Sequence, residues 1–382
     1  MTSCSGGRRS IQLSYGRRTA QSSPAAAWLL ERTRPARPMA ERQAGARAPP
    51  ATVTSDDAPG YGKRMDLSVA FLGTGGSVPT ARRATACLLV RVGGERLLFD
   101  CGEGSQRQMQ RSTGLVPVDE IYLTHYHADH YLGVPGLLKT YDLQGRERPL
   151  QIVGPPGLGE LFRALGRIVG RLSYEVELVE LEQGDAVRHD GYEVRCFGVD
   201  HRVRAYGYAL VEDERPGRFD PALAERLGVE PGPDFGRLQA GEPVDGSNGA
   251  VRPEQVMGES RRGRKLVVTG DTGPCEMVRL AAHEAELLVH DGSFADEETE
   301  RAAETGHSTA RQAAELARDA GVRLLAIVHV SSRYDVREVL AEAREEFAAT
   351  EAPRDFDLVE IPLPERGEPR LVENGARAAT QV

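Results

Sequence analysis

Short apolar runs recur from Met65 onward, and several of them are bounded by Gly, Pro or Asp. Runs of this length that are rich in Val, Ile and Leu are typical of strands buried on both faces. They predict strands over Leu67–Leu72, Cys87–Val92, Arg96–Asp100, Glu120–Thr124, Leu150–Val153, Tyr192–Val199, Ala205–Val211, Lys265–Thr269, Glu286–His290 and Arg323–Val330.

Helical periodicity is clearest late in the chain. Ser308 is a candidate N-cap for a helix that presents an Ala/Leu face and ends near Gly321. Apolar residues at i, i+3, i+4 and i+7 from Val336 to Phe347 predict a second helix. Strands interleaved with helices on this scale predict an α/β fold of stacked sheet and helix layers.

The composition adds two constraints. The chain has 382 residues, and no apolar run approaches the ~20 residues that cross a bilayer, so we expect no membrane partner. The formal charge of −9 is uneven, since residues 1–64 hold eleven Lys/Arg and four Asp/Glu (+7) and residues 65–382 hold 37 and 53 (−16). An acidic total therefore does not exclude a nucleic-acid partner, because phosphates are bound by local basic groups.

Two segments lack the strand and helix pattern. Residues 1–64 are interpreted as a disordered basic extension or as sequence before a later start at Met39 or Met65, with a transit-like peptide or an RNA-contacting arm as the alternative. Residues 212–262 are dominated by Pro, Gly and charge, as in a functional protrusion or a disordered insert. We predict one domain over 65–382 that carries this insert.

The five cysteines form no CxxC pair and no even, compact framework. This usage favours a reduced, cytoplasmic protein over a disulfide scaffold. Each cysteine is predicted to be a buried small hydrophobe.

The strongest candidate site is the run from His125 to His130, directly after the predicted strand Glu120–Thr124. It offers His125, His127, Asp129 and His130, and imidazole and carboxylate are ligands that zinc takes. Four such groups within six residues cannot all reach one ion, but ligands that point to different sides can serve two ions about 3.5–4 Å apart. The motif therefore predicts a metal centre.

Further candidate ligands follow other predicted strands: His201, Asp271 and His329. Functional side chains converge at strand ends in layered α/β folds. His189 and His283 lie outside any motif, and we predict that both are surface residues.

Residues 71–334 resemble ribonuclease Z, the tRNA 3′-processing endonuclease of the metallo-β-lactamase superfamily. The H-x-H-x-D-H run alone marks the superfamily, and two later segments, Gly-His-Ser-Thr and Ser-Ser-Arg-Tyr, narrow the match to this family. The segments that carry the resemblance are Phe71–Thr80, Asp100–Gln106, His125–His130, Gly133–Leu138, Thr269–Thr272, Gly306–Thr309 and Val328–Tyr334.

The resemblance implies a four-layer αββα metallo-β-lactamase fold with two Zn²⁺ per subunit, or Mn²⁺ or another divalent metal in their place. It implies attack of a metal-bridging hydroxide on precursor tRNA, with Asp129 assisting proton removal and His307 protonating the leaving 3′ oxygen. The products would be a tRNA 3′-hydroxyl and a trailer 5′-phosphate. The implied ligands are His125, His127 and His201 for one ion, Asp129, His130 and His329 for the other, and Asp271 as the bridge.

The resemblance also implies that 212–262 is an arm that grips the tRNA elbow from the partner subunit of a homodimer. One departure from the family is Asp291, which stands where a Glu is usual, so the acid expected to tune His307 is one methylene shorter. Arg82-Arg83 stands where Arg-Asn is more usual. The candidate substrate contacts are Arg82, Ser308, Arg333, Arg218 and Arg226.

Two alternatives remain at this point. An enzyme of the same fold could act on a small substrate, as a phosphodiesterase or as a lactone or thioester hydrolase; the arm and Gly-His-Ser-Thr argue against this. A non-catalytic RNA-binding or redox relative is the other alternative. Redox members typically carry Glu in place of the second His of the motif, and His127 argues against that assignment.

Overall fold

The predicted apolar runs form strands whose two faces are both buried. In β1 (Leu67–Gly73), Val69 and Phe71 lie in the core between two sheets, whereas Ala70 and Leu72 lie in a second core beneath helices. The computed structural model describes residues 66–373, so the predicted extension 1–64 lies outside the described residues.

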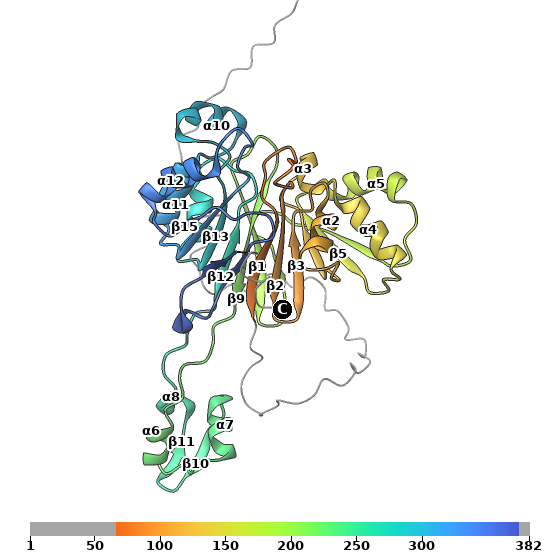
Figure 1. Ribbon diagram of the computed structural model, residues 1–382. Helices are drawn as coiled ribbons and strands as arrows, with labels where there is room; N and C mark the ends of the chain where they lie inside the picture. Colours follow the sequence, from red (N-terminus) through yellow and green to blue (C-terminus); the bar gives the residue numbers. More distant parts are fainter. Residues whose placement is uncertain (1–65, 374–382) are drawn as a thin grey trace, which may run out of the picture.

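Two sheets pack face to face (Figure 1). The first has the spatial order β17 (Arg370–Val372), β16 (Leu358–Glu360), β1, β2 (Cys87–Val92), β3 (Glu95–Phe99), β4 (Glu120–Tyr122), β5 (Leu150–Gly154) and β6 (Val176–Glu180). The second has the order β15 (Thr350–Glu351), β14 (Leu324–Val328), β13 (Leu287–Asp291), β12 (Lys265–Val268), β9 (Tyr206–Glu212), β8 (Tyr192–Gly198) and β7 (Ala186–Arg188).

Helices cover the outer face of each sheet and complete four layers (Figure 1). Those on the side of the first sheet are α2 (Ser105–Arg111), α3 (Ala128–Tyr131), α4 (Val134–Leu143) and α5 (Leu158–Val169). Those on the side of the second are α9 (Glu276–Ala282), α10 (Thr299–Thr305), α11 (Ala310–Asp319) and α12 (Val336–Glu346). The predicted αββα fold class is confirmed. Within residues 66–373, none of the helices is long and apolar enough to span a membrane.

The strand directions bring one end of each sheet to the same edge of the sandwich. Strands β3 to β6 are mutually parallel, and so are β12 to β15. Because parallel strands end on the same side, the segments that follow β3, β4, β12, β13 and β14 emerge at common edges. The candidate metal ligands lie in these segments.

Residues 212–262 are more ordered than their Pro- and Gly-rich composition suggested. They contain α6 (Pro221–Arg226), α7 (Pro233–Gln239), a hairpin of β10 (Val244–Gly246) and β11 (Gly249–Val251), and α8 (Pro253–Val256). This unit, which we call the arm, stands away from the sandwich (Figure 1). Its separate small core consists of Ala224, Val229, Leu238, Val244, Val251 and Val256.

Ion pairs anchor the arm to the sandwich. Glu365 accepts from Arg215 at 2.6 Å and from Arg261 at 2.9 Å, and so contacts both chain segments that lead to the arm. Deeper in the body, the buried Glu212 binds Arg264 in a paired geometry, and Arg264 also donates to the carbonyl of Ile361.

Two local predictions are wrong. The N-cap of α11 is Thr309, whose hydroxyl accepts from Gln312 N, and Ser308 lies one residue before it. His189 is not a surface residue: its side chain is 7% exposed and its ring stacks on Tyr192 with centroids 4.3 Å apart. His283 is exposed, as predicted.

The buried Glu212–Arg264 pair predicts a large stability effect. Glu212→Ala leaves the Arg264 guanidinium buried without its carboxylate, and we expect the free energy of unfolding to fall by about 3–5 kcal/mol. The control is Arg188→Ala, which removes an exposed pair with Asp213 and is expected to cost less than about 1 kcal/mol. Urea denaturation measures the free energy of unfolding of both variants. Equal losses of stability would contradict the larger contribution of the buried Glu212–Arg264 pair.

Candidate metal centre

Seven candidate ligands meet at the edge where the parallel strands end. His125 and His127 follow β4, and Asp129 and His130 lie in α3. The other three lie on segments of the second sheet: His201 between β8 and β9, Asp271 after β12 and His329 after β14. The structure thus brings together side chains that span about 200 residues of sequence.

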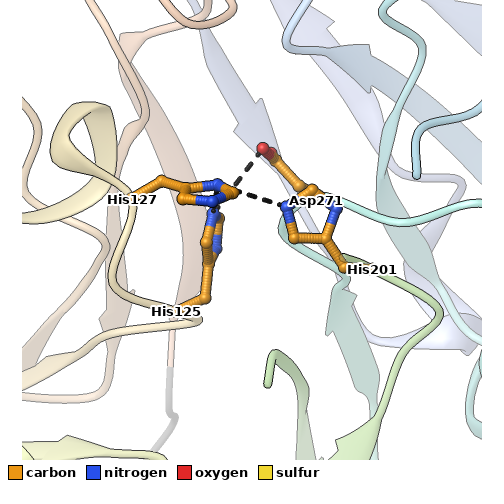
Figure 2. A group of neighbouring side chains, drawn as sticks. All are labelled: His125, His127, His201 and Asp271. Carbon is orange, nitrogen blue, oxygen red and sulfur yellow. Dashed lines mark hydrogen bonds and ion pairs between the residues drawn. The ribbon is translucent and has the colours of Figure 1, made fainter. Parts of the chain in front are cut away.

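The first group consists of His125, His127, His201 and Asp271, which face one another from different segments (Figure 2). His127 Nδ1 lies 3.0 Å from His125 Nε2 and 3.3 Å from His201 Nε2. One ligand atom from each of the four residues lies within 4.8 Å of the others, which is compact enough to surround one cation.

The second group consists of Asp129, His130, His329 and again Asp271. His130 Nε2 is 3.5 Å from Asp129 Oδ2 and 3.3 Å from Asp271 Oδ1, and His329 Nε2 is 3.3 Å and 3.4 Å from the same two oxygens. Asp271 faces the first group through Oδ2, which is 3.8 Å from His125 Nε2. One carboxylate therefore presents an oxygen to each group.

The chemistry of this cluster fits bound divalent cations. His130 Nε2 is buried and has no hydrogen-bond partner, although buried polar atoms are normally satisfied. Burial lowers the pKa of His125 well below its usual value, which favours the neutral imidazole that coordinates metal. The histidines around Asp271 hold the pKa of this carboxyl well below its usual range, in spite of the opposing effect of burial.

A second set of contacts fixes the orientation of the imidazoles. Asp100 Oδ2 lies 2.7 Å from His130 Nδ1, and the same carboxylate accepts from the amide and hydroxyl of Thr124. The Gly306 carbonyl lies 2.7 Å from His201 Nδ1, and Ser293 Oγ lies 2.8 Å from His329 Nδ1. Such partners set the tautomer and leave Nε2 toward the metal.

Asp100 and Ser293 were not among the predicted site residues. Asp100 directly follows β3, the parallel neighbour of β4. A strand-end aspartate beside the H-x-H-x-D-H run could therefore have been predicted to contact one of its histidines. Ser293 offered no comparable signal, because its role depends on a turn after β13 that brings it to His329.

His307, which is half-buried, pairs with the buried Asp291 next to the ligands. His307 Nδ1 lies 2.7 Å from Asp291 Oδ2, and its ring stacks on that of His329 with centroids 5.3 Å apart. Burial lowers the pKa of His307, but the charge and hydrogen bond of Asp291 outweigh this effect and raise it to about 9. The aspartate therefore reaches His307 although it is shorter than the glutamate usual in the family.

Four of the seven candidate ligands open onto a cavity of about 520 Å³. Its lining consists of Ser77, His127, Asp129, His201, Arg202, Val203, Asp271, Thr305 and His307. Asp129 and His307 thus border the space where a substrate would lie.

None of the predicted substrate contacts lines this cavity. Ser308 is fully buried, and its hydroxyl donates to the carbonyl of Thr272. Arg82 is exposed on the loop after β1, and Arg218 and Arg226 are exposed on the arm. Arg333 is half-exposed, lies over the ring of Phe294 and pairs with a glutamate.

The Asp100–His130 contact generates a prediction. Asp100→Asn keeps the shape of the side chain but removes the charge that orients and polarises His130, and we expect metal affinity to fall about 10–100-fold. Asp190→Asn, at an exposed aspartate, is the matched control and should leave affinity unchanged. Competition with a chromophoric chelator measures both, and equal affinities would exclude this role for Asp100.

Comparisons with known proteins agree with this geometry. Residues 80–203 match the family described as the metallo-β-lactamase superfamily, and residues 243–330 match the β-lactamase superfamily domain. The chain is 48% identical to ribonuclease Z of Methanosarcina acetivorans and 50% identical to ribonuclease Z of Myxococcus xanthus. Each match spans 302 residues, which is 78% of this chain and 98% of the relative.

Solved structures show the same likeness. Human tRNase Z, short form, is 26% identical with a TM-score of 0.56, over 78% of this chain and 100% of that chain. A metallo-β-lactamase fold protein from Bacillus subtilis reaches a TM-score of 0.58 at 18% identity, over 77% of this chain and 99% of that chain, which is a likeness of fold alone.

Proposed function

Because the chain belongs to the ribonuclease Z family of the metallo-β-lactamase superfamily, we propose that it is a zinc-dependent endoribonuclease that removes the 3′ trailer from precursor tRNA. The observation that carries the proposal is the convergence of seven ligand side chains in two groups that share Asp271, beside a cavity that four of the seven line. Membership of the family also confirms the resemblance read from the motifs, and it makes the chain a metal-dependent hydrolase.

The donor set supports zinc as the metal. Five imidazoles and two carboxylates are ligands that zinc accepts readily. We propose that His125, His127 and His201 hold one ion, that Asp129, His130 and His329 hold the other, and that Asp271 bridges the two. When bound, the ions would supply a water nucleophile at neutral pH and positive charge for the phosphoryl transition state.

The protein side chains divide the proton transfers between two sides of the cavity. Asp129 borders the cavity, and its pKa is held far below the usual value by His130 and His329, against the opposing effect of burial, so it is ionised. Its place at the cavity is the ground for assigning it a part in proton removal. His307 is bonded to Asp291 through Nδ1, which leaves Nε2 to protonate the leaving 3′ oxygen. This division yields a tRNA 3′-hydroxyl and a trailer 5′-phosphate.

The position of the arm supports a homodimer. Strand β12 begins at Lys265, next to the base of the arm, and the segment after it carries Asp271 at the opposite end of the sandwich. Figure 1 shows the arm projecting beyond the end of the sheets that lies away from α3. Because the arm points away from the metal centre of its own subunit, we propose that it binds tRNA processed by the partner subunit.

The cysteines support a location in the cytoplasm. Those of the described residues, Cys87, Cys101, Cys196 and Cys275, are all free. The first three are buried and Cys275 is half-buried, as expected of small hydrophobes in a reducing compartment.

Cleavage of a 3′-extended precursor tRNA tests the proposal. We expect wild-type protein to cut after the discriminator base, and a strong chelator to abolish the cut. Asp271→Ala removes the carboxylate shared by both ligand groups and should reduce cleavage below detection, whereas Asp190→Ala should cleave normally. Intact precursor alongside turnover of a small phosphodiester would exclude the tRNA assignment and leave the hydrolase assignment in place.

The arm generates a separate prediction about affinity. The guanidinium groups of Arg218 and Arg226 are exposed and have no ion pair within residues 66–373, whereas Arg237 pairs with two acids of the arm. If the arm binds phosphates, the double variant R218A/R226A should raise KM for precursor tRNA about 10-fold. It should also reduce the slope of log KM against log salt concentration by about 1.4–1.8, the value for two lost phosphate contacts. R237A is the control. If R237A raised KM as much as the double variant does, the change would reflect the net charge of the arm and not phosphate contacts of Arg218 and Arg226.

A further inference from the structure

Arg202 is a cation at the mouth of the cavity that no group of residues 66–373 neutralises. It directly follows His201 and lines the cavity together with His127, Asp129 and His307. Its side chain is exposed, and within residues 66–373 its guanidinium has no recorded hydrogen bond or ion pair. A free guanidinium beside a site for phosphate chemistry is available to an anionic ligand.

Several other surface arginines are paired with acids, in contrast to Arg202. Arg311 and Arg318 bind acids of α12, and Arg237 binds two acids within the arm. The chain from residue 65 onward carries −16, so surface arginines have many acids to pair with. At the cavity the nearby carboxylates, Asp129 and Asp271, face the metal ligands instead.

Close packing against Gly306 positions the base of the Arg202 side chain. A Cβ on Gly306 would lie 3.0 Å from Arg202 Cγ and 3.2 Å from His201 Nδ1, so the arginine stem lies close against Gly306. The Gly306 carbonyl also accepts from His201 Nδ1 at 2.7 Å. These contacts join the loop that carries Arg202 to the loop that carries His307.

We propose that Arg202 binds a backbone phosphate of the RNA next to the scissile phosphate, on the side of the leaving 3′ oxygen. This inference rests on the proposed function, which assigns protonation of that oxygen to His307. The scissile phosphate itself would be held by the metal centre and His307, so a guanidinium beside His307 meets the next phosphate along the strand. Val203, 41% exposed, adds an apolar surface for the ribose or base between the two phosphates.

The proposal makes Arg202 a specificity-determining residue. A polynucleotide offers a second phosphate beyond the one that is cut, whereas a small diester such as bis(p-nitrophenyl) phosphate does not. Loss of Arg202 should therefore weaken the reaction with RNA far more than the reaction with the small diester.

The test compares R202A, R202K and R204A in the full chain on both substrates. Arg204 is a matched control, since it is exposed on the same loop but does not line the cavity. For R202A we expect kcat/KM on precursor tRNA to fall about 10–100-fold. The slope of log kcat/KM against log salt concentration should become shallower by the amount that about one phosphate contact contributes. The loss on bis(p-nitrophenyl) phosphate should be about tenfold smaller. R202K should recover most of the activity on RNA, and R204A should match wild type.

The outcomes separate this inference from the proposed function. Equal losses on the two substrates would overturn it, because they would place Arg202 at the scissile phosphate or at the metal centre; zinc content of R202A distinguishes these. Wild-type activity of R202A on RNA would also overturn it. A wild-type protein that hydrolyses the small diester and leaves precursor tRNA intact would overturn the proposed function, and the assignment of Arg202 with it.

Discussion

The contact between Gly270 and Thr124 sets the distance between the two halves of the metal centre. A Cβ on Gly270 would lie 2.7 Å from Thr124 Cβ, and Gly270 has a φ of +63°, which glycine adopts without strain. His125 directly follows Thr124 and Asp271 directly follows Gly270, so this close approach places the imidazoles of one sheet beside the carboxylate of the other. A larger residue at either end of the contact would move the ligands that follow β4 away from Asp271.

Three buried carboxylates lie at the same edge of the sandwich. Asp100, Asp271 and Asp291 are nearly inaccessible to solvent, and each is compensated by imidazoles or by backbone and hydroxyl donors. Burying carboxylates without partners would cost several kcal/mol each. The arrangement is therefore stable only as a network, in which each acid orients a histidine and each histidine offsets the burial of an acid. Divalent cations would complete it by neutralising the excess negative charge.

Elements buried on both faces could be predicted from the sequence, because their apolar runs are continuous. All ten predicted strands exist, with ends shifted by no more than two residues. The strands β6 and β7 were missed because they lie at sheet edges with partly exposed faces, where the run of apolar residues is interrupted. The arm core was missed because its six apolar residues are dispersed among charged residues and turns. In the site, the candidate ligands that lie together could be named from the motifs, whereas the positions of Ser293 and Arg202 depend on how separate loops meet.

The placement of cations explains how an acidic body can accept a polyanion. Most arginines described above are neutralised by acids of the chain, such as Arg215 and Arg261 by Glu365. Exposed arginines without an ion pair within residues 66–373 include Arg218 and Arg226 on the arm and Arg202 at the mouth of the cavity. An RNA that touches only one of these places meets repulsion from the rest of the surface, which carries −16 from residue 65 onward. A folded tRNA with a single-stranded 3′ end has the shape to reach an arm and a cavity at once. Selectivity on this view comes from the spacing between the arm and the cavity and not from the net charge of the surface.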